Sequence, residues 1–302
     1  MVQACTQSST PAARDAVNAA RLVAGDGVPL ALAHYGDGAA PALLFAHGFG
    51  QTRHAWDDTA TALATQGWHC VTADARGHGE SGWATDGAYD YAQLIDDVAR
   101  IARVSTPADT LPILVGASMG GLVGLCAQAL HAPLFRALIL VDITPRWEAA
   151  GVARIIGFMR AHPNGFANYN EAADAIAAYL PHRTERKSPD QLRKLLVTHS
   201  DGRLRWHWDP RLLDYIETHS DAWQTAIADA ARRIDVPTLL ISGARSDVVS
   251  DATIAEFLQL VPHARHVRVD ATHMVAGDAN TAFARALQEF LRTLSPSLRL
   301  GT

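Results

Sequence analysis

Short apolar runs recur along the chain and predict the strands of a single sheet. They are separated by longer segments with a helical spacing of apolar residues, and they cover Val28–Ala33, Ala42–Ala46, His69–Asp74, Leu111–Val115, Ala137–Asp142, Thr238–Ser242 and His266–Val269. Several of the runs are continuously apolar, which is typical of strands covered on both faces of a mostly parallel sheet. We therefore predict an α/β fold with helices on both faces of the sheet.

Amphipathic helices are predicted between the runs. The clearest begins after Asp90, a residue type that caps helix N-termini, and its apolar stripe comprises Tyr91, Leu94, Ile95, Val98, Ile101 and Ala102. A second helix is expected from about Thr281 to Leu291. Strand–helix alternation of this kind favours a doubly wound α/β sheet.

The alternation stops once, between residues 144 and 234. This stretch offers no strand candidate, is rich in aromatic residues and is interrupted by Pro163, Pro181, Pro189 and Pro210. We interpret it as a helical lid over the carboxyl edge of the sheet, where open α/β sheets bind their ligands. A small helical domain unrelated to the site is the alternative. The predicted division is a flexible tail over 1–24, a core domain formed by 25–143 and 235–302, and the lid over 144–234.

Composition and charge narrow the function classes. A net charge of −5 with scattered Lys and Arg gives no basic patch for nucleic acid. Three cysteines do not build a disulfide framework, and Cys70 and Cys126 are predicted to be core residues. The first twenty residues lack a secretory pattern and are expected to be loose, turning helical toward Ala13–Arg21. No apolar run approaches the ~18 residues of a membrane span, so a soluble, cytoplasmic protein is expected.

The strongest chemical signal is the run Gly116-Ala117-Ser118-Met119-Gly120, which follows an apolar run and precedes a helix of small and apolar residues. A serine at such a sharp strand-to-helix turn is held in a strained conformation, and the flanking glycines let the backbones pass. We predict that Ser118 is a nucleophile and that the Met119 N–H faces the reacting oxygen as half of an oxyanion hole. The alternative is that Ser118 only caps the helix.

The other half of the oxyanion hole is expected from the loop His47-Gly48-Phe49-Gly50, directly after the run Ala42–Ala46. A glycine-flanked turn at a strand end can aim the Phe49 N–H at the same point. His47 is interpreted as structural, because a base must lie on the other side of the nucleophile from the oxyanion donors.

A base and an acid are needed to activate the serine. His273 follows the last apolar run and precedes the C-terminal helix, a position that returns it to the carboxyl edge of the sheet. Asp247, just past the run Thr238–Ser242, is predicted to orient His273. The order Ser, Asp, His along the chain is the one expected for this arrangement. Asp142 is the rival acid, interpreted as part of a turn because Thr144 and Pro145 follow it closely.

Other features point away from cofactors. The chain contains no phosphate-binding glycine pattern and no ligand spacing such as H-E-x-x-H, so neither a cofactor nor a metal is expected. The polar turn from Asp74 to Ser81 is interpreted as a loop that braces the site. Four residues are candidate substrate contacts, with lid core as the alternative for the lid tryptophans: Trp147, Trp206, Trp208 and Met274.

Together these motifs resemble the α/β-hydrolase superfamily from about residue 25 to 293. The residues that carry the resemblance are the His-Gly-Phe-Gly loop, the Asp-Ala-Arg-Gly-His-Gly-Glu-Ser turn, the Gly-Ala-Ser-Met-Gly-Gly elbow, the Ser-Asp pair and the last histidine. Within the superfamily the chain is similar to the group of bacterial esterases, enol-lactonases and cofactor-free haloperoxidases (perhydrolases). Epoxide hydrolases and haloalkane dehalogenases place aspartate where Ser118 stands. Carbon–carbon bond hydrolases commonly place asparagine where Ala117 stands.

The resemblance implies a carboxylic ester or lactone hydrolase that forms an acyl-enzyme on Ser118. The aromatic lid favours an uncharged or weakly polar small-molecule substrate of small to medium size. A carbon–carbon bond hydrolase with the same three residues is the first alternative. A ligand-sensing protein with a hydrolase fold and little turnover is the second.

Overall fold

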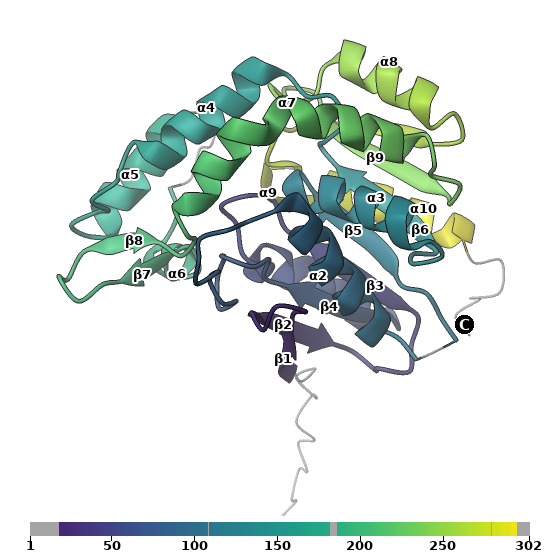
Figure 1. Ribbon diagram of the computed structural model, residues 1–302, viewed down its shortest axis with the longest axis horizontal. Helices are drawn as coiled ribbons and strands as arrows, with labels where there is room; N and C mark the ends of the chain where they lie inside the picture. Colours follow the sequence, from purple (N-terminus) through teal and green to yellow (C-terminus); the bar gives the residue numbers. More distant parts are fainter. Residues whose placement is uncertain (1–17, 108, 182–185, 279, 295–302) are drawn as a thin grey trace, which may run out of the picture.

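The core of the protein is an eight-stranded sheet, seen here in a computed structural model that describes residues 18–107, 109–181, 186–278 and 280–294 (Figure 1). Its strands follow the order β1-β2-β4-β3-β5-β6-β9-β10. The β1–β2 and β2–β4 pairs are antiparallel, and all the others are parallel. The strands are β1 Asn18–Val23, β2 Pro29–Tyr35, β3 Ala42–Ala46, β4 His69–Ala73, β5 Ile113–Ala117, β6 Ala137–Val141, β9 Thr238–Gly243 and β10 Arg265–Val269. The mostly parallel α/β sheet predicted from the sequence is confirmed.

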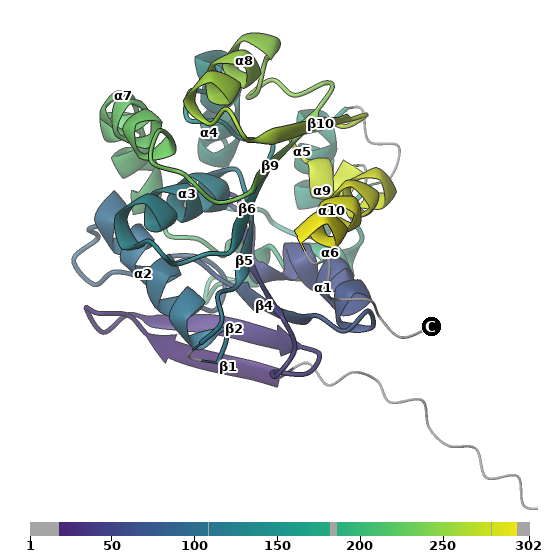
Figure 2. The ribbon, with the colours of Figure 1, turned by 90° about the vertical axis from the view of Figure 1, so that its right-hand side faces the viewer.

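Helices cover both faces of this sheet (Figure 2). On one face lie α2 (Tyr91–Val104) and α3 (Met119–His131), and on the other lie α1 (Asp57–Ala64) and α10 (Asn280–Leu294). The remaining core elements are η1 Arg53–Trp56, α8 Asp251–Leu260 and α9 Val275–Asp278. As predicted, Asp90 caps α2: its carboxylate accepts the Ala92 N–H at 3.0 Å.

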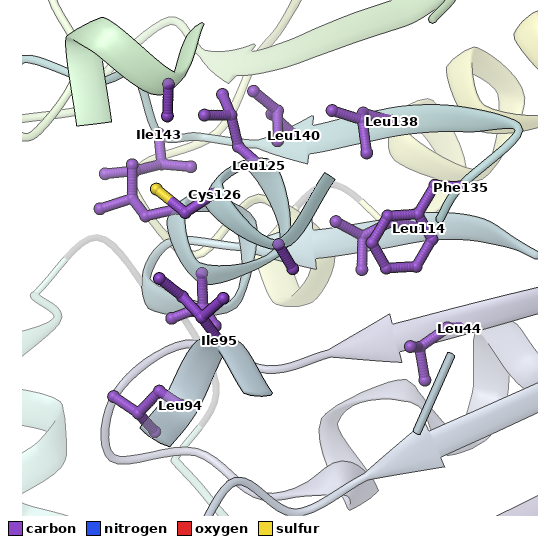
Figure 3. Close-up of a cluster of buried hydrophobic side chains, with 14 of the residues drawn as sticks. Leu44, Leu94, Ile95, Leu114, Leu125, Cys126, Phe135, Leu138, Leu140 and Ile143 are labelled. Carbon is purple, nitrogen blue, oxygen red and sulfur yellow. The ribbon is translucent and has the colours of Figure 1, made fainter. Parts of the chain in front are cut away.

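Two apolar layers fix the strands from both sides. The layer under α2 and α3 joins sheet residues such as Leu114 and Leu140 to Ile95 and Leu125 (Figure 3). The opposite layer joins the other faces of the same strands to α1 and α10, with Phe283 fully buried. Since the central strands are buried on both faces, their ends are held in fixed positions relative to one another.

Residues between β6 and β9 form a separate layer beside the sheet (Figure 1). It contains α4 Ala149–Arg160, α5 Tyr169–Tyr179, α6 Pro189–Arg193, β7 Leu196–Thr198, β8 Leu204–Trp206 and α7 Arg211–Ala231. Its first part has a small core of its own, in which Phe166 meets Trp206 edge to face at 5.3 Å. The expectation of no strand here is wrong, because β7 and β8 pair as an antiparallel hairpin. The end of α7 packs Ile227 into the layer under α2 and α3.

The expectations for the N-terminal segment need correction. Asn18–Val23 is neither loose tail nor helix but the edge strand β1, paired with β2 from Asn18↔His34 to Val23↔Pro29. The physical reason is that every second side chain of this segment faces the core, as in a strand. Ala20 and Leu22 pack on the core, while their neighbours are exposed. The expectation for residues 1–17 lies outside the described residues.

Cys70 and Cys126 are buried free thiols, as expected for core residues. Burial raises the pKa of the Cys70 thiol to about 12 and that of Cys126 to about 11, so both stay protonated. Cys5 lies outside the described residues. Within the described part of the chain, no helix has both the length and the apolar character to cross a membrane.

Candidate active site

Ser118 lies at a sharp turn between β5 and α3, with φ 47° and ψ −120°. Two glycines make this turn possible. A Cβ on Gly116 would lie 2.6 Å from the Gly121 Cα, and a Cβ on Gly120 would lie 2.5 Å from the Ala46 carbonyl oxygen. Since contacts this short with backbone atoms cannot be relieved, the glycines are required where the sequence analysis expected them.

His273 lies in the loop after β10 and reaches the serine. Its Nε2 lies 3.2 Å from the Ser118 Oγ, and its Nδ1 lies 2.8 Å from a carboxylate oxygen of Asp142. A carboxylate accepts hydrogen bonds, so Nδ1 carries the proton and Nε2 is free to accept the proton of the serine hydroxyl. The loop after the last strand therefore places the imidazole within hydrogen-bond reach of the serine hydroxyl.

The carboxylate beside His273 belongs to Asp142, not to Asp247 as the sequence analysis predicted. Asp142 directly follows β6, has φ 49° and is fully buried. It also accepts the Gly243 N–H at 2.6 Å and the hydroxyl of Ser246. Three donors thus satisfy a buried charge that would otherwise be costly.

Asp247 points to the inserted layer instead. Its carboxylate accepts the Nε–H of Arg154 in α4 at 2.6 Å and remains about one-third exposed. A Cβ on Gly151 would lie 2.0 Å from the Asp247 carbonyl oxygen, so α4 passes directly over this loop. The Glu148 N–H also donates to the Val248 carbonyl at 2.9 Å. Asp247 therefore anchors α4 rather than the histidine.

The sequence signal for Asp142 was its position at the end of an apolar run. In the structure this run forms β6, which Asp142 directly follows and which pairs with β5, the strand that leads to Ser118. The Ser-Asp-His order holds for Asp142 as well as for Asp247. Thr144 and Pro145 favour a turn, and the chain does bend at Pro145 and Arg146, but Asp142 still lies directly after β6.

The loop after β3 passes beside the serine. A Cβ on Gly48 would lie 3.2 Å from the Ser118 Cβ, which brings the next residue, Phe49, to the rim of the site. Met119 is the first residue of α3, where backbone N–H groups lack partners within the helix. Both residues predicted to supply oxyanion donors therefore line the space around Ser118.

Three buried histidines join this loop, the turn after β4 and the inserted layer by accepting backbone N–H groups. The His47 Nε2 accepts from Ala75 at 2.9 Å, the His78 Nε2 accepts from Gly50 at 3.3 Å, and the His207 Nδ1 accepts from Gly79 at 2.7 Å. Burial lowers the pKa of all three, to about 4 for His207, and neighbouring imidazoles lower the pKa values of His78 and His207 further. They stay neutral acceptors at neutral pH.

The polar turn after β4 supports the same loop. Asp74 is fully buried, pairs with the Arg53 guanidinium and accepts the Arg53 N–H at 2.7 Å and the Glu80 N–H at 3.0 Å. A Cβ on Gly79 would lie 2.4 Å from the Asp74 carboxyl carbon. The turn is thus a hydrogen-bonded brace between β4 and the segment after β3.

The sequence profile of the α/β-hydrolase fold matches residues 41–279, which include the serine, the histidine and both aspartates. The chain belongs to the α/β-hydrolase family. It is 30% identical to an esterase of Mycobacterium tuberculosis over 84% of this chain and 83% of that protein. It is 30% identical to a 3-hydroxybutyrate-oligomer hydrolase of Cupriavidus necator over 80% of this chain and 85% of that protein. The crystal structure of E-2-(acetamidomethylene)succinate hydrolase superimposes with a TM-score of 0.76 at 24% identity, covering 92% of this chain and all of the other.

Two cavities of this hydrolase meet at Ser118. The first, called the α7 cavity, is lined by Tyr91, Met119, Trp147, Ile156, Trp223 and Ile227. The second, called the His273 cavity, is lined by Gln51, Phe158, Met159, Tyr179, Trp206 and His273. Their volumes are about 110 and 260 Å³.

Three of the four candidate contact residues line one of these cavities, and the fourth is buried outside them. Trp147 lines the α7 cavity, while Trp206 and Met274 line the His273 cavity. Trp208 lines neither; it is buried and packs its ring against Phe49 at 5.2 Å. The expectation of a substrate contact is therefore corrected for Trp208, which supports the loop behind the site.

Proposed function

We propose that this hydrolase cleaves carboxylic esters through an acyl-enzyme on Ser118. His273 acts as the base, and Asp142 holds the imidazole in the required tautomer. The observation that supports the proposal most is the continuous hydrogen-bonded series from the Ser118 hydroxyl through the two ring nitrogens of His273 to the buried Asp142 carboxylate. This series joins a nucleophile, a base and an orienting acid.

In the first half-reaction the Ser118 oxygen attacks the ester carbonyl carbon while its proton passes to the Nε2 of His273. The carbonyl π electrons move onto the oxygen, which the N–H groups of Phe49 and Met119 would stabilise. When this oxyanion collapses, the bond to the alcohol oxygen breaks. That oxygen takes the proton from Nε2, and an acyl group remains on the serine.

In the second half-reaction water replaces the alcohol. The Nε2 of His273 removes a proton from the water as it attacks the acyl carbon, and the Ser118 oxygen leaves with that proton. The Asp142 carboxylate stabilises the transient imidazolium in both halves without taking its proton. The products are a carboxylic acid and an alcohol.

The relatives support ester chemistry, since two at 30% identity are named as an esterase and as a hydrolase of 3-hydroxybutyrate oligomers. A second candidate, a carbon–carbon bond hydrolase with the same residues, draws support from the 28% identity to 2-(acetamidomethylene)succinate hydrolase of Mesorhizobium japonicum. A substrate panel separates the two, because a carbon–carbon hydrolase would process diketone ring-fission products far faster than esters.

The mechanism is tested by Ser118→Ala with a chromogenic ester. We expect kcat to fall by about 10⁶-fold, as happens when a covalent nucleophile is removed. Ser105→Ala is the matched control, because the Ser105 hydroxyl donates to the Ile101 carbonyl near the end of α2 and Ser105 lines neither cavity at Ser118. Wild-type turnover by the Ser118 variant would rule the mechanism out.

A further inference from the structure

The two cavities at Ser118 differ in which catalytic groups they contain. Ser118 and Phe49 line both cavities, whereas His273 lines only the His273 cavity and Met119 lines only the α7 cavity. The nucleophile therefore borders both cavities, and the base borders one of them.

This asymmetry decides where each half of an ester lies, given the proposed function on which the inference rests. The tetrahedral carbon bears the serine oxygen, the oxyanion, the acyl chain and the departing alcohol oxygen. The alcohol oxygen must receive its proton from the Nε2 of His273, so it has to lie on the histidine side. We infer that the alcohol part occupies the His273 cavity, that the acyl chain occupies the α7 cavity, and that helix α4 separates the two.

The α7 cavity suits an apolar acyl chain. Its walls come from α2, α3, α4 and α7 and are almost entirely apolar, with the rings of Tyr91 and Trp223 stacked 4.8 Å apart. Burial raises the pKa of the Tyr91 hydroxyl well above its ordinary value, so this polar group stays uncharged. A charged acyl chain would lose its hydration here without gaining a partner of opposite charge.

The His273 cavity is larger and suits a flat or oxygen-bearing alcohol. Phe158 and Tyr179 stack at 4.1 Å and form an aromatic wall with Trp206. The indole N–H of Trp206 is buried and has no hydrogen-bond partner among the described residues. Since buried N–H groups are usually paired, an acceptor oxygen on the alcohol part would satisfy this one.

Helix α4 forms a wall of both cavities through two neighbouring stripes. Val152 and Ile156, four residues apart, line the α7 cavity, while Ile155 and Met159, also four apart, line the His273 cavity. Ile155 lines both cavities and so stands at their boundary. Met159 reaches across to the loop after β3, where a Cβ on Gly50 would lie 2.3 Å from its Cε.

The matched variants Ile156→Trp and Met159→Trp test this assignment, because each adds similar bulk to one stripe of the same helix. Two substrate series are compared: p-nitrophenyl esters of increasing acyl length, and acetate esters of alcohols of increasing size. We expect Ile156→Trp to lower the octanoate-to-acetate ratio of kcat/KM about 10- to 100-fold and to leave the alcohol ratios within about threefold. Met159→Trp should do the reverse.

Two outcomes overturn the inference separately from the proposed function. If Ile156→Trp changes the alcohol ratios and Met159→Trp the acyl ratios, the assignment is reversed and wrong, although Ser118 still forms the acyl-enzyme. If both variants change both ratios equally, α4 does not separate the cavities. Labelling of Ser118 by a fluorophosphonate shows that each variant is folded, and Ile156→Phe and Met159→Phe replace any that is not. Failure of the wild-type Ser118 to react at all would instead remove the proposed function.

Discussion

The carboxyl edge of the sheet and the helical insertion contribute to the site in different ways. At the sheet edge, Ser118 and Asp142 follow the neighbouring strands β5 and β6, and both have positive φ angles. Backbone geometry fixes them, and glycines with no space for a Cβ surround the serine. The insertion instead contributes side chains, mainly from α4 and α7, that shape the cavities. In the proposed mechanism, the reacting groups thus depend on backbone positions, and substrate choice depends on side-chain packing.

The aspartates Asp142 and Asp247 illustrate this difference. Asp142 belongs to the sheet edge, is fully buried and touches His273. Asp247 belongs to the contact with the insertion, is partly exposed and pairs with Arg154. Ser246 links the two, since its hydroxyl donates to Asp142 while its neighbour holds α4. One loop therefore supports the proposed acid and anchors the insertion.

Substitution of the two aspartates is expected to give the largest difference. Asp142→Asn keeps the shape of the side chain but favours the wrong histidine tautomer, and kcat should fall by about 10⁴-fold. Asp247→Asn removes a partly exposed ion pair and should change kcat by less than about threefold. The kcat values of the two variants, measured by steady-state kinetics with one ester, show which aspartate acts with His273. A large loss in Asp247→Asn with little loss in Asp142→Asn would restore Asp247 as the acid.

A second contrast uses two glycines. In Gly120→Ala the new Cβ would lie within 2.7 Å of three backbone atoms of Ala46 and His47, and the free energy of unfolding should fall by about 3 kcal/mol. Gly157→Ala, on the exposed side of α4 with no atom within 4 Å, should raise it by about 0.5–1 kcal/mol. Denaturant unfolding measures both. Equal changes in the free energy of unfolding would mean that the backbone at the sheet edge is no more constrained than the backbone of the insertion.

The third and smallest effect concerns pH. The pKa of His207 lies near 4 in the folded protein, lowered first by burial and then by the nearby His47, whereas an unfolded histidine titrates near 6.5. Neutral His207 therefore stabilises the fold fully above about pH 6.5. This contribution is lost as the pH falls toward 4 and should already be smaller by about 2 kcal/mol at pH 5.

His207→Asn tests this dependence because asparagine retains an acceptor near the Nδ1 position without titrating. The free energy of unfolding of the variant should fall less steeply between pH 7 and pH 5 than that of the wild type. His47 and His78 shift in the same direction, so part of the slope should remain. An unchanged slope would show that His207 is not held neutral in the folded protein.

The sequence predicted the turn at Ser118 and the position of His273 because these signals are local. The run from Gly116 to Gly120 predicts a strained turn by steric arguments alone, and His273 was found from its place after the last strand. Strand β1 was missed because its alternation of inward and outward side chains extends over only six residues and lies next to a polar segment. The hairpin β7–β8 was missed because each of its strands has three residues.

The acid that contacts His273 and the residues that line the cavities could not be identified from local sequence signals. Both aspartates follow a strand and precede the histidine, so chain order does not separate them. The separation comes from strand order, which places β6 between β5 and β9 and which sequence periodicity does not show. Trp206 and Trp208 are two residues apart, yet one lines a cavity and the other packs behind the loop. Such differences depend on how the insertion folds on the sheet.

The central claim is that Ser118 becomes covalently acylated during turnover. Rapid quenching with acid during hydrolysis of p-nitrophenyl acetate, followed by digestion and mass spectrometry, measures this directly. We expect an acetyl group on the peptide that contains Ser118, formed at least as fast as the steady-state rate and absent from Ser118→Ala. Release of p-nitrophenol with Ser118 unmodified at every quench time, or an acetyl group turning over on another side chain, would contradict the claim.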